Sequence, residues 1–266
     1  MNRIENTDYA LTDLHFNVGL IAQYHSQSQV ARRLTENWVV EHMYCPRCGH
    51  LHIRQFENNR PVADFFCPEC GSQYELKSKN GTLGHKVADG AYETMIERIT
   101  GNRNPDFLFM SYSKADYMVR SLFLIPKYFF VPAIIEKRRP LEPPARRAGW
   151  VGCNIMIDQI PEQGRISIIE EGKVKDSEEV LQKVNASKRL ETKDLKSRGW
   201  IMDILQCVNQ IVTPDFSLQD MYAFEQNLSE KHPENCNIKP KIRQQLQILR
   251  DKGFIEFLGN GQYRKL

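Results

Sequence analysis

The 266-residue sequence has no long apolar run. No stretch approaches the roughly 20 apolar residues that a membrane-spanning helix requires, and the segment from Met1 to Asn6 lacks the apolar core of a signal peptide. These absences exclude a protein built from membrane-spanning helices, and we expect a cytoplasmic protein with no membrane partner. Hydrophobic residues make up 41% and charged residues 26% of the chain, as in ordinary globular proteins, and its length suffices for two modest domains.

Cysteine is scarce and unevenly placed. Four of the seven cysteines lie in two Cys-x-x-Cys pairs, whereas Cys153, Cys207 and Cys236 are isolated. A disulfide framework in a secreted domain would use its cysteines more evenly, so this distribution favours a reducing compartment.

The two cysteine pairs have the spacing of a zinc site. Each pair reads Cys-Pro-x-Cys-Gly, and the four candidate ligands are Cys45, Cys48, Cys67 and Cys70. Four thiolates can enclose one tetrahedral Zn²⁺ and leave no open coordination position, which predicts a structural zinc. The alternative, four unrelated cysteines, does not account for the repeated proline and glycine.

The second cysteine pair separates two acidic residues. Residues 61–66 and 74–77 have the pattern of strands, and if these strands pair around the cysteine turn, Asp64 and Glu75 converge. Two carboxylates suit Mg²⁺, and Lys77, on the same face of its strand as Glu75, can orient and polarise a water for attack on phosphorus. The spacing alone also fits an exposed Glu–Lys pair on an ordinary strand. The position within a zinc-tied hairpin favours the metal site.

The net charge of +3 is small but is concentrated at one end of the chain. Residues 236–266 hold seven Lys or Arg against two Asp or Glu, a local net charge of +5. The pattern predicts helices at 197–211, 217–228 and 238–252 and then a hairpin with a glycine turn, which is the order of a winged helix. A solvated charged helix is the simpler alternative. The side chains that we expect to contact DNA are Lys239, Lys241, Arg243 and Gln244 on the third helix and Arg264 and Lys265 on the wing.

A proline-rich basic segment interrupts the body of the chain at 136–150. Its prolines exclude a regular element, and its arginines and lysines lie beside one tryptophan. Such a loop can grip DNA phosphates with Arg146 and Arg147 and can offer the flat apolar ring of Trp150 to a base. The alternative, a surface loop whose Trp150 packs into the core, fits the sequence equally well.

The rest of the chain mixes helices and strands. Strands are expected at 105–112, 118–125 and 165–169, helices at 11–26, 28–39 and 91–99, and a polar linker between two domains at 174–195. Asp89 and Gly90 are expected to lead into the third of these helices. Strands mixed with helices on a chain of this size predict an α/β body.

Five longer strings carry a resemblance to a known family. The strings are 56–65, 74–79, 145–150, 241–252 and 261–266. Through them the chain resembles the DpnI-like methyl-directed restriction endonucleases from about Leu14 onward, and residues 1–12 look like an extension. The resemblance implies a PD-(D/E)XK catalytic domain with an embedded zinc module over 1–190 and a winged-helix DNA-binding domain over 191–266.

The resemblance also implies the chemistry. The metal-binding and catalytic residues of the family match Asp64, Glu75 and Lys77, although Ala63 precedes Asp64 here and Pro61 lies three residues back. It further implies Mg²⁺-dependent cleavage of double-stranded DNA at 5′-GATC-3′ carrying N6-methyladenine. The winged helix would then be a second methyl-sensitive reader.

Two further residues receive roles in this hypothesis. Trp150 falls at a position that the family associates with the methyladenine pocket, and we expect the backbone carbonyl of Leu76 to complete the Mg²⁺ ligand set of a monomeric enzyme. Two alternatives stay open: a zinc-containing winged-helix DNA-binding regulator without catalysis, and a nuclease with another target, such as a different methylated site or RNA. A regulator would have no need of the two acids and the lysine.

Overall fold

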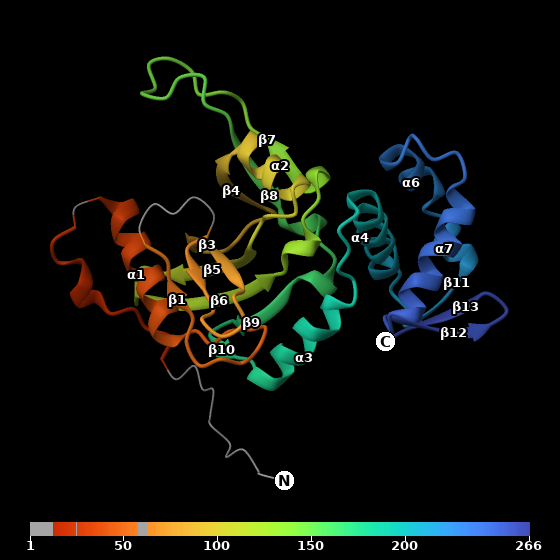
Figure 1. Ribbon diagram of the computed structural model, residues 1–266, viewed down its shortest axis with the longest axis horizontal. Helices are drawn as coiled ribbons and strands as arrows, with labels where there is room; N and C mark the ends of the chain where they lie inside the picture. Colours follow the sequence, from red (N-terminus) through yellow and green to blue (C-terminus); the bar gives the residue numbers. More distant parts are fainter. Residues whose placement is uncertain (1–12, 25, 58–62) are drawn as a thin grey trace, which may run out of the picture.

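A computed structural model describes residues 13–24, 26–57 and 63–266 (Figure 1). Within these residues, seven strands form the central sheet in the order β1-β2-β3-β5-β6-β9-β10. β3 and β5 run parallel, and the other neighbouring strands run antiparallel. The strands are β1 (Arg54–Gln55), β2 (Phe65–Phe66), β3 (Gln73–Asn80), β5 (Asp106–Ser113), β6 (Met118–Ile125), β9 (Ile166–Glu170) and β10 (Lys173–Val174).

Both faces of the sheet are covered by apolar side chains. On β5, Leu108 and Met110 enter one core while Phe107 and Phe109 enter the other, as the alternation of a strand requires. Helices α1 (Gln27–His42) and α3 (Ser177–Lys188) cover the first face (Figure 1). The second face is covered by α2 (Tyr92–Thr100) and by a small antiparallel sheet of β4 (Lys86–Ala91), β8 (Gly152–Met156) and β7 (Ile135–Lys137).

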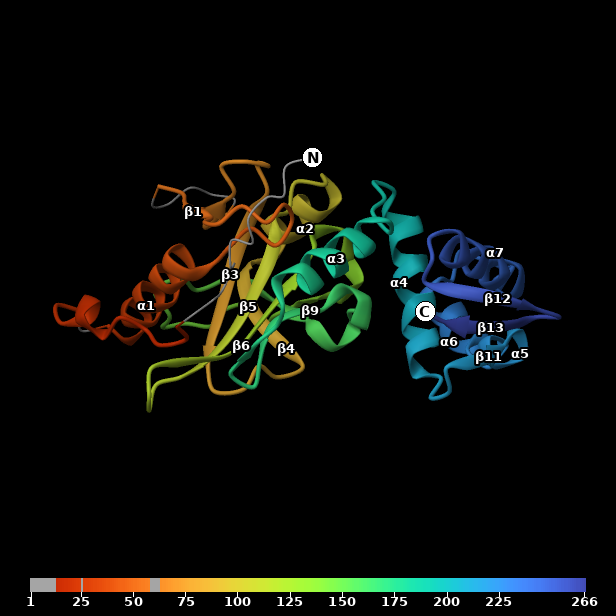
Figure 2. The same cartoon turned by 90° about the horizontal axis from the view of Figure 1, so that it is seen from below.

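Helix α4 (Leu195–Gln210) stands between this body and a small C-terminal module (Figure 2). Its buried residues belong to a core that continues from α2 and the small sheet into the module. The module follows with β11 (Asp215–Ser217), α5 (Leu218–Tyr222), α6 (Glu225–Lys231), α7 (Ile238–Asp251), β12 (Ile255–Gly259) and β13 (Gln262–Lys265). The predicted fold class, an α/β body followed by a small winged-helix module, is confirmed.

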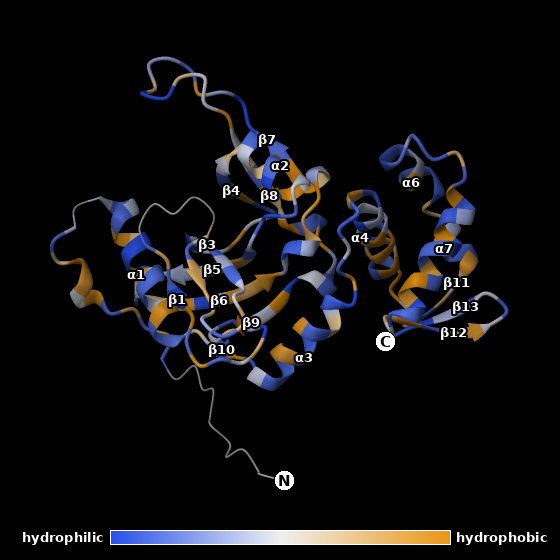
Figure 3. Ribbon diagram, in the orientation of Figure 1, coloured by the Kyte–Doolittle hydropathy of each residue, from blue (hydrophilic) through white to orange (hydrophobic). Residues whose placement is uncertain are grey.

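Hydropathy explains why α4 and the module fold as expected. Apolar and hydrophilic residues alternate along α4 and α7 (Figure 3), and the apolar residues Ile242, Leu246 and Leu249 are fully buried on the inner side of α7. Ser217 caps α5 in a reciprocal capping box with Asp220, which fixes where that helix begins. The expected helix at 217–228 is divided into α5 and α6.

Two expectations for the body are wrong. Residues 13–24 of the expected helix at 11–26 contain only a 3-10 turn, η1 (Val18–Ile21), and the backbone of His15 instead bridges Met118 of β6. The expected linker at 174–195 is mostly α3, whose polar composition hides a stripe formed by Val180 and Val184 against the sheet.

A third difference lies next to the candidate site. The segment at Asp89 and Gly90, which was expected to lead directly into a helix, belongs to strand β4, and α2 begins only at Tyr92.

The expected strands at 105–112, 118–125 and 165–169 are confirmed as β5, β6 and β9. Further 3-10 turns are η2 (Lys127–Phe129), η3 (Pro132–Ile134), η4 (Ile157–Gln159) and η5 (Glu162–Gly164). Among the helices of the described residues, none combines the length and apolar character that crossing a membrane demands.

Candidate active site and metal centre

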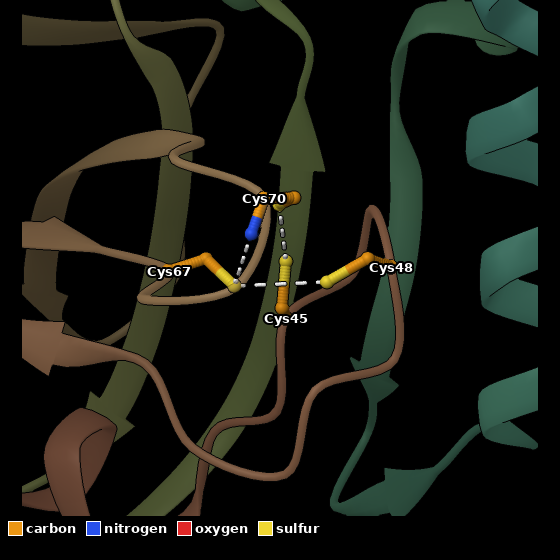
Figure 4. Close-up of side chains that lie close together, drawn as sticks. All are labelled: Cys45, Cys48, Cys67 and Cys70. Carbon is orange, nitrogen blue, oxygen red and sulfur yellow. Dashed lines mark hydrogen bonds between the residues drawn. The ribbon is translucent and has the colours of Figure 1, made fainter.

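The four paired cysteines converge on one point (Figure 4). Their sulfur atoms all lie within 4.8 Å of one another, and the Cys45–Cys70 and Cys48–Cys67 sulfur distances are both 3.6 Å. Four sulfur atoms placed about 2.3 Å from one Zn²⁺ are about 3.8 Å apart at the corners of a tetrahedron. The observed spacing therefore fits a tetrahedral soft metal ion and is far too long for disulfide bonds.

The two cysteine turns share one backbone geometry. The amide of Gly49 donates to the carbonyl of Cys45 at 2.9 Å, and that of Gly71 donates to the carbonyl of Cys67 at 3.0 Å. Both glycines have positive φ, 78° and 70°, where a side chain would be strained. The repeated Cys-Pro-x-Cys-Gly pattern thus encodes two matching loops that present their thiols inward.

The thiols differ in how readily they ionise. Burial raises the pKa of Cys45 and of Cys48 above the ordinary value. Burial also acts to raise the pKa of Cys70, but the hydroxyl of Ser72, 3.2 Å from its sulfur, and the Ser72 backbone amide outweigh it and bring this pKa to about 7. Three or more thiolates crowded without a cation would repel one another, so this donor set fits a bound Zn²⁺.

The zinc-type site is tied to both neighbouring strands of the sheet. The phenol of Tyr74 on β3, fully buried, lies 3.0 Å from the sulfur of Cys45. Arg47, inside the first cysteine turn, makes two hydrogen bonds of 2.6 and 2.9 Å with the buried carboxylate of Asp106 on β5. The cysteine turns therefore hold the start of β3 and β5 in place.

The expected hairpin is present on the other side of the second cysteine turn. β2 pairs antiparallel with β3, with Phe65 opposite Tyr74, so that Asp64 extends the same register toward Glu75. The amide of Asp64 donates to the carbonyl of Tyr74 at 2.9 Å, and its carboxylate accepts the amide of Leu76 at 2.8 Å. The structure thus brings Asp64 to the backbone that carries Glu75.

Glu75 and Lys77 lie on the face of β3 opposite to Tyr74. The ammonium of Lys77 is 2.6 Å from one oxygen of Glu75, and Arg98 of α2 is 3.4 Å from the other. Lys77 also contacts the carboxylate of Asp89 on β4. The side chains of Glu75, Lys77 and Asp89 are only 15%, 17% and 6% exposed, so this is a buried charged cluster.

Burial and charge act in opposite directions on Lys77. Burial lowers its pKa, but the negative charges of Glu75 and Asp89 outweigh this effect and raise the pKa above the ordinary lysine value. For Glu75, burial raises the pKa, and the charges of Asp89 and Asp64 add to the effect while Lys77 opposes it. The lysine is thus held as an ammonium at neutral pH.

Asp64 and Glu75 offer oxygen ligands of the kind that a hard divalent cation prefers. Asp64, Glu75 and Asp89 contribute three carboxylates against the two cations Lys77 and Arg98, which leaves a formal negative charge in a partly buried place. Carboxylate and carbonyl oxygens are the ligands that Mg²⁺ uses in proteins. A cation held by Asp64 and Glu75 would offset part of the repulsion among the three acids.

Sequence reasoning missed Asp89 and Arg98. Both come from elements outside the hairpin, β4 and α2, and they reach Lys77 and Glu75 through tertiary contacts. Local spacing gives no indication of such a contact, and the expectation that Asp89 and Gly90 lead into a helix overlooked strand β4, in which Asp89 lies.

The basic segment at 136–150 leaves the small sheet between β7 and β8 and projects from the body (Figure 1). Trp150 is half-buried, with the guanidinium carbon of Arg147 4.4 Å from its ring centroid. A side chain added at Gly152 would meet this ring at 2.8 Å, so the tryptophan packs against the start of β8. Arg146 is exposed. The two expectations for Trp150, stacking on a base or packing in the core, both remain predictions.

The candidate DNA-contacting residues of the module lie on its surface or near it. Lys239, Arg243 and Gln244 are exposed on α7, and Lys241 is half-buried. Several have intramolecular partners: Arg243 donates to the Tyr222 hydroxyl at 2.7 Å, and Lys241 donates to Gln244 at 2.8 Å. On the wing, Arg264 makes two bonds of 2.7 and 2.9 Å with Asp215, and Lys265 contacts the carbonyl of Ile211.

Comparison with known families matches both parts of the chain. A family model described as DpnI, Dam-replacing family, matches residues 12–193. A second model, described as Dam-replacing HTH domain, matches residues 196–265.

Proposed function

The chain belongs to the Dam-replacing DpnI family of methyl-directed restriction endonucleases, and we propose that it cuts double-stranded DNA at 5′-G(N6-methyl-A)TC-3′ by Mg²⁺-dependent hydrolysis of a phosphodiester. Membership implies methylation-dependent restriction of DNA. The target sequence, the metal and the roles of individual residues are our proposals.

The observation that carries the proposal is the buried cluster on β3. Ordinary surface Glu–Lys pairs are exposed and contribute little, whereas Glu75 and Lys77 are mostly buried and have Asp64 and Asp89 beside them. Burying so many charges costs desolvation free energy, and such clusters occur preferentially at functional sites. A PD-(D/E)XK nuclease site requires acids and a lysine arranged in this way.

The residues then have distinct roles. Asp64 and Glu75 would hold the Mg²⁺ together with the backbone carbonyl of Leu76, and the cation, when bound, would stabilise the charge that develops on the phosphate and on the leaving oxygen. Lys77 donates a hydrogen bond to the attacking water and orients it toward phosphorus. The ammonium is available for this role because its acidic neighbours keep it protonated.

Two readers on one chain suit the recognition of a methyl group. Burying one methyl group is worth only about 1 kcal/mol, roughly a fivefold preference, so one contact discriminates weakly. A palindrome can carry the mark on both strands. We propose a catalytic domain over 1–190, with Arg146, Arg147 and Trp150 at the DNA, and a winged-helix domain over 191–266 that reads the methyl group a second time. A single protomer then suffices.

Cleavage of one plasmid from two hosts tests the proposal. With Mg²⁺ present, plasmid DNA from an adenine-methylating host should be cut to fragments that end at GATC sites, and the same plasmid from a non-methylating host should stay intact. Cutting of neither preparation while both are bound would favour the regulator, and equal cutting of both would contradict methyl dependence. Cutting of RNA or of another methylated site would replace the target.

The α7 surface gives a separate prediction. Arg243→Ala should weaken binding of the full chain to methylated DNA about tenfold, and the slope of log K against log salt should fall by about 1 if one phosphate contact is lost. Arg250→Ala is the matched control, because Arg250 lies on the same helix but pairs with the neighbouring Asp251. Unchanged affinity and salt slope in Arg243→Ala would indicate a merely solvated charged helix.

A further inference from the structure

Asp89 reaches the candidate catalytic lysine from a different sheet. Lys77 lies on β3 of the central sheet, whereas Asp89 lies on β4 of the small sheet, and their side chains form an ion pair. The Asp89 side chain is 6% exposed, less than either Glu75 or Lys77. A carboxylate so well buried requires a partner, and the partner described here is the ammonium of Lys77.

The backbone around Asp89 is shaped for this contact. β4 pairs antiparallel with β8, with Asp89 opposite Cys153, and the register shifts between Asp89 and Ala91, so that Gly90 is the extra residue of a β-bulge. A bulge bends its strand and changes the direction of the neighbouring side chain. The strand thereby directs Asp89 away from its own small sheet and onto β3.

The chemistry of the proposed site requires such an anchor. Lys77 has two carboxylate partners, Glu75 and Asp89, and Glu75 is assigned as a metal ligand. When the oxygens of Glu75 coordinate a cation, the ion pair between Glu75 and Lys77 becomes weaker. A lysine on a four-carbon stem loses catalytic precision when it is free to move. Asp89 remains as its fixed partner.

We propose that Asp89 is a positioning residue that holds the ammonium of Lys77 at the attacking water. The inference rests on the proposed nuclease function. Its main rival is a third carboxylate ligand for the cation. In the described part of the chain, the four cysteines form the one group of three or more candidate ligand side chains gathered closely enough to hold a metal ion. Asp64, Glu75 and Asp89 do not form such a group, which favours the positioning role.

Kinetics of Asp89→Asn test the role. Single-turnover and steady-state cleavage of methylated plasmid should show kcat lowered at least tenfold with KM and DNA affinity changed less than twofold, and Asp89→Glu should recover part of the loss because it restores the charge. Glu170→Gln is the matched control: it removes a strand carboxylate that pairs with Lys175 at 2.5 Å, far from β3. A kcat within twofold of the wild type, or a loss confined to KM, would overturn the proposal.

A second measurement does not depend on cleavage. In the metal-free wild-type protein, the ammonium of Lys77 should give a slowly exchanging ¹H–¹⁵N signal, identified by its loss in Lys77→Met, and Asp89→Asn should broaden or remove it. An unchanged signal would contradict the anchor. Failure of the wild type to cut DNA would instead overturn the proposed nuclease function. The NMR signal would still report whether Asp89 holds the ammonium of Lys77.

A double variant covers the case in which Asp89→Asn does not fold. Lys77→Met with Asp89→Asn removes both charges of the buried pair. If Asp89 acts only through Lys77, the double variant should cut no more slowly than Lys77→Met when the single-turnover rate is measured with enzyme in excess over DNA. A further loss of more than threefold would show that Asp89 has an independent role and would refute the proposal.

Discussion

Asp64→Asn should lower the single-turnover rate of cleavage of methylated GATC DNA at least about a thousandfold, which corresponds to about 4 kcal/mol of transition-state stabilisation. The expectation follows from where Asp64 lies. Its carboxylate accepts the amide of Leu76 at 2.8 Å, next to Glu75. An asparagine oxygen can still accept that bond, so the local fold should persist, while the negative charge that suits Mg²⁺ is lost.

Binding separates this loss from damage to the protein. DNA affinity measured with Ca²⁺ in place of Mg²⁺ should change less than about threefold in Asp64→Asn, because the DNA contacts are assigned to other residues. Asp116→Asn is the matched control, since Asp116 is a partly exposed acid that pairs with Arg120 on the β5–β6 turn. Full cleavage by Asp64→Asn would remove the assignment of this residue.

The parts of the site that the sequence predicts are those encoded by short spacing. The Cys-x-x-Cys pattern predicts the geometry of each cysteine turn. Only one long-range contact, between the two turns, is then needed for the four sulfur atoms to converge. Asp64 and Glu75 flank the second turn, so pairing β2 with β3 brings them near each other. A hairpin is a local structure, and its register follows from the alternation of the strands together with the length of the turn.

The parts that the sequence does not predict depend on how separate elements pack. Asp89 and Arg98 join the cluster from β4 and α2, and their contacts follow from the placement of the small sheet over β3 and β5. The same limit explains α3, where Val180 and Val184 are buried within an otherwise polar segment. It also explains residues 13–24, where Leu14, one of the apolar side chains at helical intervals, belongs to a short segment whose backbone pairs with the start of β6.

Replacing a zinc ligand should have the largest effect on stability. Cys45→Ser should reduce the zinc content from about one ion per chain to near zero and lower Tm by roughly 10–20 °C, since losing even about 5 kcal/mol has this effect on a domain of this size. The reason is the position of the site: Cys45 is fully buried and contacts Tyr74, the residue before Glu75. In the variant, the metal loses one of its four cysteine ligands. The start of β3 then loses its anchor.

The two variants should therefore lose activity in different ways. Asp64→Asn should retain zinc and Tm while cleavage is lost, whereas Cys45→Ser should lose zinc, Tm and cleavage together, because the cysteine turns act on catalysis only by holding β2 and β3. Cys236→Ser is the control, since this cysteine is exposed and isolated from the pairs. Metal analysis, thermal unfolding and plasmid cleavage on the three variants provide the comparison. A zinc-free Cys45→Ser protein with wild-type Tm and cleavage would show that the hairpin holds its two acids in place without the metal.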